Sequence, residues 1–232
     1  MTLANKNYFI IGALSDIGIA LCKELAIGQA HCILLDKPSA KLDTLYDELI
    51  TLGAASVLLC PLDRLTAIPD HYPEIASHLA ENYSCLDGLI FTEGAFIGLT
   101  PLEHLDITKW LSVIQVNLNT PFALCKALLP LLKKSTQSNI IFTEGVAANP
   151  SKAYWGPHCV AEFGIQGLAA VLNAEYANTN VHAHVINPGP IKCTQRLRAF
   201  PAEDYSALPA ISSIIPSYLN ILSECQNHDG NA

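Results

Sequence analysis

Residues 8–18 read YFIIGALSDIG and join an apolar run to a turn marked by glycine. The run over 8–11 predicts a buried strand, and the apolar stretch after Gly18 predicts a helix. A strand, a turn and a helix form the first half of a βαβ unit, whose helix N-terminus can hold an anion. The usual anion is a dinucleotide pyrophosphate. Asp16 stands where the backbone should approach that phosphate closely, so the sequence indicates the fold more strongly than the ligand.

The composition indicates one α/β domain. The chain has 232 residues, half of them apolar, and we predict a single domain over 1–225 followed by a polar tail over 226–232. The formal charge of −8 opposes binding to nucleic acid or to an anionic membrane. No apolar run approaches the roughly 20 residues that span a bilayer, and no signal peptide is recognisable, so we expect a cytoplasmic protein. The eight cysteines are scattered singly, which favours free thiols over disulfides or zinc.

Strands and helices alternate along the chain, which predicts a doubly wound parallel sheet of six strands. The expected strands are residues 8–11, 31–36, 56–60, 86–92, 139–143 and 181–187. The expected helices are residues 19–27, 39–52, 69–83, about 107–134, 157–177 and about 211–222. Pro121 and Pro130 could bend the fourth of these helices. Ligands of such sheets bind at the carboxyl ends of the strands, so the residues that follow each strand are the functional candidates.

In this order and spacing, the motifs resemble those of the short-chain dehydrogenase/reductase (SDR) family over nearly the whole chain. The glycine turn is similar to the family's TGxxxGIG motif, residues 91–94 (FTEG) to its NNAG motif, and residues 187–189 (NPG) with Thr194 to its PG motif. The segment 155–176 resembles a bacterial subgroup of poorly characterised SDR oxidoreductases. The resemblance implies a Rossmann-type fold and an NAD(P) cofactor. The cofactor-binding residues it implies are Gly12, Ser15, Asp16, Ile17, Gly18, Asp36, Asp63, Gly94, Pro188, Gly189 and Thr194.

Two acidic residues bear on the choice of cofactor. Asp36 lies about 20 residues after the turn, where an acid can bind the adenine ribose and favour NAD over NADP. Lys37 beside it weakens that preference. The alternative is a chance acid at a strand end, because Asp often begins a turn. Asp63 matches the acidic residue that the family places beside the adenine.

The departures from the family fall on its catalytic residues. Asn117 matches the helix asparagine of the catalytic tetrad. The preferred alignment places His158 at the tyrosine and Glu162 at the lysine, and the region of the catalytic serine ends in Gly145. A second alignment makes Tyr154 the tyrosine and His158 the lysine. Neither alignment produces the family's YxxxK motif.

These substitutions change the chemistry of the site. The family's lysine lowers the pKa of its tyrosine, whereas a carboxylate at Glu162 would raise the pKa of a neighbouring acid. Glu162 could still accept hydrogen bonds from ribose hydroxyls. His158 could act as a general acid, because Glu162 would favour its protonated form. The alternative is an i,i+4 pair on the helix surface without a catalytic role.

The remaining substitutions on this edge of the sheet are also acidic. Asp16, Glu93, Glu144 and Glu162 replace neutral or basic residues of the family. Two like charges 4 Å apart repel by about 4 kcal/mol at an effective dielectric near 20, which weakens pyrophosphate binding roughly a thousandfold. The acidic edge could instead bind a cation, including a metal through His158, Glu162 and Glu144. Because an HxxxE pattern is common, we predict no metal site. Drift after loss of the cofactor is the third explanation.

Three functions remain open from the sequence. The first is a degenerate SDR protein with weak or lost catalysis that works as a scaffold. The second is an active NAD(P)-dependent oxidoreductase of a small carbonyl or alcohol substrate, with His158 as acid or base. The third is a sensor of a dinucleotide or another small ligand. The absent serine, tyrosine and lysine favour the first and third, whereas Asn117 and the PG motif keep the second open.

The C-terminal region predicts features of the sheet and the assembly. It lacks the family's seventh strand, so the sixth strand should be an edge protected by loops. The two long helices, about 107–134 and 157–177, are expected to form the family's two-fold homodimer contact.

Overall fold

The structure, a computed structural model, describes residues 3–145 and 152–223. Its centre is a six-stranded parallel sheet with the order β3-β2-β1-β4-β5-β6. The strands are β1 Asn7–Ile11, β2 His31–Leu35, β3 Ser56–Leu59, β4 Gly88–Phe91, β5 Ser138–Thr143 and β6 Val181–Ile186. The strand order reverses between β1 and β4, as in a doubly wound Rossmann-type sheet, and this confirms the predicted fold. The predicted boundary at residue 225 and the polar tail lie outside the described residues.

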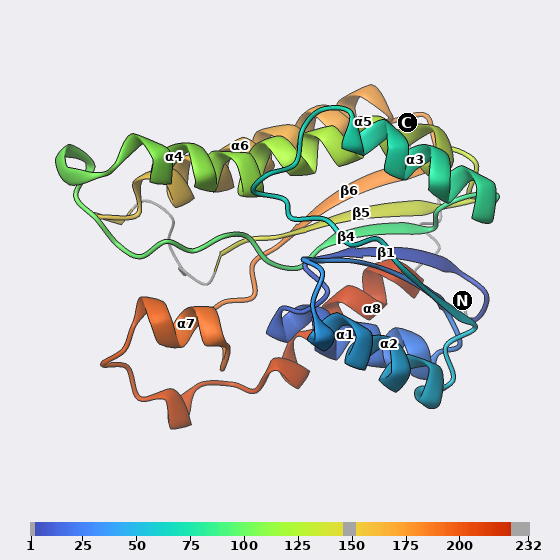
Figure 1. The fold of residues 1–232 in the computed structure, drawn as a ribbon, viewed down its shortest axis with the longest axis horizontal. Coiled ribbons are helices and arrows are strands. Elements are labelled where there is room, and N and C mark those ends of the chain that lie inside the picture. The colour runs from blue at the N-terminus through green and yellow to red at the C-terminus, as the bar shows by residue number, and fades with distance from the viewer. Residues whose placement is uncertain (1–2, 146–151, 224–232) are drawn as a thin grey trace, which may run out of the picture.

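Helices cover both faces of the sheet (Figure 1). One layer contains α3 His71–Asn82, α4 Ile107–Ile114, α5 Thr120–Leu132 and α6 Gly156–Glu175. The other contains α1 Asp16–Ile27, α2 Ala40–Leu52 and α8 Ile215–Ser223. Alternate strand residues fill two separate cores: Ile10 packs beneath α1 and Ile11 packs on the opposite face. Both faces of the strands are therefore apolar, as expected for a buried parallel sheet. No helix among the described residues is long and apolar enough to cross a membrane.

The helix predicted over 107–134 is interrupted. A π-helical segment, Gln115–Asn119, separates α4 from α5. Pro121 explains its position, because proline lacks an N–H and its ring would clash with the carbonyl of Asn117, four residues earlier. Pro130 lies inside α5 without ending it. The widened turn places Asn117 at the carboxyl ends of the strands.

Two features near the C-terminus were not predicted. The first is a short helix, α7 Thr194–Ala199, beyond the carboxyl ends of the strands (Figure 1). The second is at edge strand β6, which we expected loops to protect. The Asn173 side chain of α6 instead accepts from the Ala183 N–H and donates to its carbonyl, each at 2.8 Å. One amide therefore occupies a donor and an acceptor of this edge strand.

Candidate functional site

The turn between β1 and α1 is tightly packed. Gly12 has a φ of +80°, and a Cβ at Gly18 would overlap the Gly12 carbonyl oxygen. The Ser15 hydroxyl accepts from the Gly18 N–H at 2.9 Å. The Thr92 hydroxyl, from the end of β4, lies 2.8 Å from the Gly12 carbonyl oxygen and 2.9 Å from the Ser15 hydroxyl. The two glycines are required by backbone geometry and close approach, whether or not a ligand binds here.

The carboxylates around this turn accept from backbone N–H groups of the protein itself. Asp16 Oδ2 accepts from the Thr194 N–H at 2.5 Å, which connects the turn to the start of α7. Asp36 Oδ2 accepts from the Leu14 N–H at 2.9 Å, and its Oδ1 accepts from the Lys37 N–H at 2.8 Å. A ribose hydroxyl would therefore share the Asp36 oxygens with two backbone donors.

The other residues implied for the cofactor occupy the same edge. Asp63 forms an ion pair with Lys37 at 3.0 Å. Burial opposes ionisation of Asp63, but the hydrogen bonds from Lys37 and a backbone N–H hold its pKa below the ordinary value. The Ile17 side chain is buried in the core, so only its backbone can meet a ligand. Gly189 follows the buried Pro188 with a φ of +65°.

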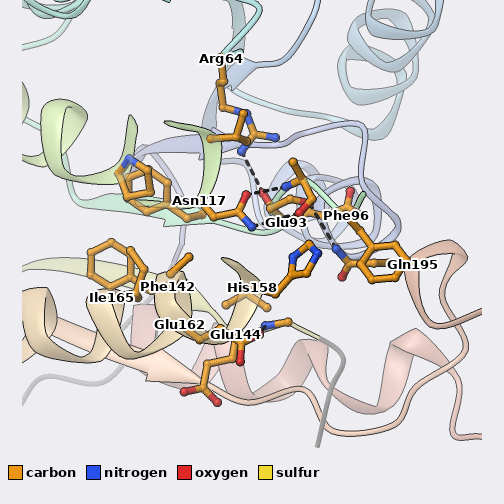
Figure 2. A pocket seen from close by; sticks show the side chains of 18 of the residues that line it. Arg64, Glu93, Phe96, Asn117, Phe142, Glu144, His158, Glu162, Ile165 and Gln195 are labelled. Atoms are coloured by element: carbon orange, nitrogen blue, oxygen red, sulfur yellow. Dashed lines mark hydrogen bonds between the residues drawn. The ribbon is translucent and has the colours of Figure 1, made fainter. Parts of the chain in front are cut away.

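A cavity lies beside this turn, between the segment after β4 and α6 (Figure 2). It brings together the three predicted catalytic residues, Asn117, His158 and Glu162. Tyr154 is 56% exposed and is not among the residues that line this cavity, so the second alignment leaves its tyrosine outside. The lining residues that sequence reasoning missed include Arg64, Phe96, Trp155 and Gln195. Gln195 belongs to the undetected helix α7, and no motif marked Arg64 or Phe96. Trp155 was noted only as the start of the segment 155–176, not as a site residue.

The Asn117 side chain forms hydrogen bonds with the backbone of the segment that follows β4. Its Oδ1 accepts from the Ala95 N–H at 2.6 Å and its Nδ2 donates to the Ala95 carbonyl at 3.1 Å. A Cβ at Gly94 would come within 2.6 Å of the Asn117 amide, so glycine permits this contact. The Asn117 side chain is thus already engaged by the protein.

His158 is buried, with 5% of its surface exposed, and lies between aromatic rings. Its ring centroid is 5.1 Å from that of Phe96 and 5.8 Å from that of Trp155. Burial lowers the pKa of His158 to about 4, although a hydrogen bond with the Gly98 backbone raises it. Its Nε2 has no hydrogen-bond partner among the described residues.

Two expectations for His158 were therefore wrong. The residue does not form a helix-surface pair with Glu162, because the ring is buried. Glu162 does not hold the imidazole in its protonated form, because desolvation dominates and leaves the ring neutral near pH 7.

Glu162 occupies the space beside the position of the family's serine. Its Oε1 accepts from the Gly145 N–H at 3.0 Å, and a Cβ at Gly145 would overlap that oxygen. Burial raises the pKa of Glu162 to about 7; the Gly145 N–H lowers it and the charge of Glu144 raises it. Glu144 itself accepts from the side-chain amides of Gln166, at 2.5 Å, and Asn187, at 2.8 Å.

Glu93 lies on the opposite wall of the cavity (Figure 2). Burial raises the pKa of Glu93 to about 7, Arg64 and Arg198 lower it, and Asp16 and Asp36 raise it. Arg64 Nη1 also donates to the Glu93 carbonyl at 2.9 Å. The acid on this wall, unlike Glu162, therefore has cations close by.

Comparison with known proteins identifies the family. The family model for short chain dehydrogenases matches residues 6–204. This chain belongs to the SDR family. It is 30% identical to the uncharacterised oxidoreductase YciK of Escherichia coli K12 over 222 residues, which are 96% of this chain and 88% of that protein.

Solved structures agree with this assignment. A short chain dehydrogenase of Salmonella enterica serovar Typhi superposes with a TM-score of 0.90 at 31% identity, covering 95% of this chain and 91% of that one. A short chain dehydrogenase of Shigella flexneri 2a, complexed with NADP, superposes with a TM-score of 0.89 at 30% identity, covering 96% and 93%. Together with the similarity to YciK, they confirm the predicted place in a bacterial subgroup of uncharacterised SDR oxidoreductases.

Proposed function

We propose that this SDR protein binds a nicotinamide dinucleotide and has weak or no activity on ordinary carbonyl and alcohol substrates. The observation that carries this proposal is the replacement of the serine, tyrosine and lysine positions by Gly145, His158 and Glu162, all of which line the cavity. Carbonyl reduction needs a proton donor and stabilisation of negative charge on the substrate oxygen. A neutral imidazole and the Glu162 carboxyl group replace the phenolic hydroxyl and the ammonium that the family's tyrosine and lysine supply.

The turn fits a dinucleotide with one adjustment. Gly12 and Gly18 keep the tight geometry, and the N-terminus of α1 faces the carboxyl ends of the strands. Asp16 occupies the Thr194 N–H, so a phosphate at this N–H would require its carboxylate to turn away. A nicotinamide bound at this edge would supply a hydride donor or acceptor at the cavity.

We propose NADP(H) as the tighter ligand. Lys23, Lys41 and Arg198 line the groove beside the turn, where they suit an additional phosphate. The Shigella flexneri relative was solved with NADP, and a short chain dehydrogenase of Escherichia coli CFT073 with NADPH, the latter 31% identical with a TM-score of 0.88 over 96% of this chain and 93% of that one. The preference for NAD based on Asp36 is the competing prediction.

Isothermal titration with NADPH and NADH, at low and moderate salt, tests the proposal. We expect micromolar binding of NADPH, weaker binding of NADH, and no NADPH oxidation above background with a panel of small aldehydes and ketones. Absence of binding up to millimolar concentration would contradict the proposal and favour a scaffold. Tighter binding of NADH would support the role predicted for Asp36.

A second candidate function is alcohol oxidation with His158 as general base. The unpartnered Nε2 of a neutral imidazole favours it. The base would be available above pH about 4, because the ring is neutral there. Turnover that disappears in His158→Ala, while NADPH still binds, would establish this function in place of the first. Binding without turnover would leave the sensor or scaffold role.

We also propose a homodimer through the face of α4, α5 and α6. Large apolar side chains on this face are 46–66% exposed: Ile107, Leu111, Phe122, Val160, Phe163 and Val171. Gly167 lies on the same face of α6 with open space around it, which would let a second helix approach closely. Light scattering should show a dimer for the native chain and a monomer for Phe163→Asp. Ile50→Asp on α2, where the exposed fraction is 46%, is the matched control and should remain dimeric.

A further inference from the structure

The α6 wall of the cavity carries two acids without a cation. Glu144 and Glu162 form no ion pair with any described residue, and Glu144 raises the pKa of Glu162 by its charge. The sequence of residues 146–151, VAANPS, contains no lysine, arginine or histidine. Hydrogen bonds from Gly145, Gln166 and Asn187 satisfy some oxygens but leave the negative charge unbalanced. Two neighbouring carboxylates in this state attract a positive ligand.

His158 supplies an independent observation. Its imidazole is more than nine-tenths buried, lines the same cavity, and has an Nε2 without a partner among the described residues. Because its hydrogen bond with the Gly98 backbone raises the pKa, the ring donates this bond and Nε2 is left as an acceptor. A buried acceptor without a donor is unfavourable, so a ligand that brings an N–H would satisfy it.

The aromatic residues complete this wall. Phe96 and Trp155 both line the cavity, with ring centroids 5.7 Å apart. Aromatic faces attract organic cations and accommodate apolar groups. The charges of Arg64 and Arg198 act on Glu93, on the opposite wall, which leaves the α6 wall as the cation-attracting side. Within the described part of the chain no three His, Cys, Asp or Glu residues come together to hold a metal ion.

We propose that this cavity binds the ammonium group of a small organic amine, placed between Glu162 and the Nε2 of His158, with its apolar part against Phe96 and Trp155. This ammonium site lies in the cavity of the proposed function and adds a ligand class to it. It rests on the proposed function only in that the two share this cavity. An ammonium provides both the positive charge and the N–H donors that this wall lacks. A carboxylate ligand would be repelled, and an alcohol would bring a donor without the charge.

The test is isothermal titration at pH 8 with benzylammonium, benzyl alcohol and benzoate, which share one aromatic group. We expect benzylammonium to bind at millimolar or lower concentration, benzyl alcohol to bind about tenfold more weakly, and benzoate not to bind. Glu162→Gln should weaken benzylammonium binding about tenfold, because the amide keeps the shape and removes the charge. Glu175→Gln, at the exposed end of the same helix, should leave it unchanged. His158→Phe should also weaken binding, since it removes the acceptor and keeps a ring.

Equal affinities for benzylammonium and benzyl alcohol, or stronger binding of benzoate, would overturn the proposal. So would no binding of benzylammonium at concentrations on the order of 10 mM, or an unchanged affinity for it in Glu162→Gln. Thermal unfolding of each variant without ligand confirms that the protein is folded. Titration with NADPH in separate samples distinguishes the two proposals. Amine binding without NADPH binding would contradict only the proposed function, and the reverse would contradict only the ammonium site.

Discussion

Two regions at the carboxyl ends of the strands accommodate acidic substitutions in different ways. One is the β1–α1 turn and the other is the β5–α6 wall of the cavity. In the turn, Asp16 and Asp36 accept from the Thr194 and Leu14 N–H groups. In the wall, burial raises the pKa of Glu162 to about 7, although the Gly145 N–H lowers it. The acids of the turn accept hydrogen bonds from backbone N–H groups of neighbouring segments, whereas in the wall burial opposes the ionisation of Glu162. The difference indicates that the turn is stable as it stands and that the wall is suited to a ligand.

The largest expected effect concerns Asp16 and a bound phosphate. Asp16→Asn keeps an oxygen that can accept from the Thr194 N–H and removes the charge. If the carboxylate comes within about 4 Å of the pyrophosphate, relief of about 4 kcal/mol should tighten NADPH binding up to about a thousandfold. Titration at low salt measures the change, and Asp47→Asn on α2 is the control. An unchanged affinity would mean that Asp16 does not oppose the cofactor.

The next effect tests whether the turn is rigid. In Gly18→Ala the added Cβ would overlap the Gly12 carbonyl, so α1 must shift and the free energy of unfolding should fall by about 3 kcal/mol. Gly53→Ala adds a Cβ in open space at a φ of +100°, so only backbone strain of about 1 kcal/mol is expected. Urea unfolding compares the two variants. Equal losses would show that the turn is more adaptable than its contacts indicate.

A smaller effect tests the unbalanced charge of Glu162. Its folded pKa of about 7 lies above the ordinary glutamate value of 4.5, so its ionisation destabilises the fold as the pH rises through that interval. Glu162→Gln should therefore raise the free energy of unfolding by about 1–2 kcal/mol more at pH 8.5 than at pH 5, after allowance for partial exposure. Urea unfolding at both values measures this. A gain that is the same at both would show that Glu162 is not strained by its charge.

The smallest effect concerns hydroxyl groups in the two regions. Thr92→Val removes the hydroxyl that contacts the Gly12 carbonyl and Ser15, and should lower the free energy of unfolding by about 1–2 kcal/mol. Ser138→Ala at the start of β5 removes a buried hydroxyl with no partner among the described residues, so it should be neutral or stabilising. Thermal unfolding compares them. A larger loss in Ser138→Ala would reverse this ranking.

Local patterns predicted most of the architecture. Short apolar runs between glycine and polar residues located all six strands, and their alternation with helices predicted the parallel sheet. The helix Thr194–Ala199 was missed because six residues carry too little periodicity to distinguish a helix from a loop. The Asn173 amide on the edge strand was also missed, because its partner lies ten residues away in another element.

The position of the site was predicted from the sequence, but the protonation of its residues was not. The spacing of His158 and Glu162 placed both on one face of a helix, and the structure places them in one cavity with Asn117. The direction of the His158 pKa shift was wrong, because a nearby carboxylate could be read from the sequence whereas burial between Phe96 and Trp155 could not.

The sequence by itself determined the six-stranded parallel sheet and the residue types that meet at the carboxyl ends of its strands, because these follow from local periodicity and from the chirality of parallel crossovers. Only the tertiary structure decided the state of these residues. The Asp16 carboxylate accepts a hydrogen bond from the Thr194 N–H, and the Glu162 side chain fills the space beside Gly145. The Nε2 of His158 has no hydrogen-bond partner among the described residues. Desolvation and hydrogen bonding depend on what surrounds a group from all sides, and those neighbours come from distant parts of the chain.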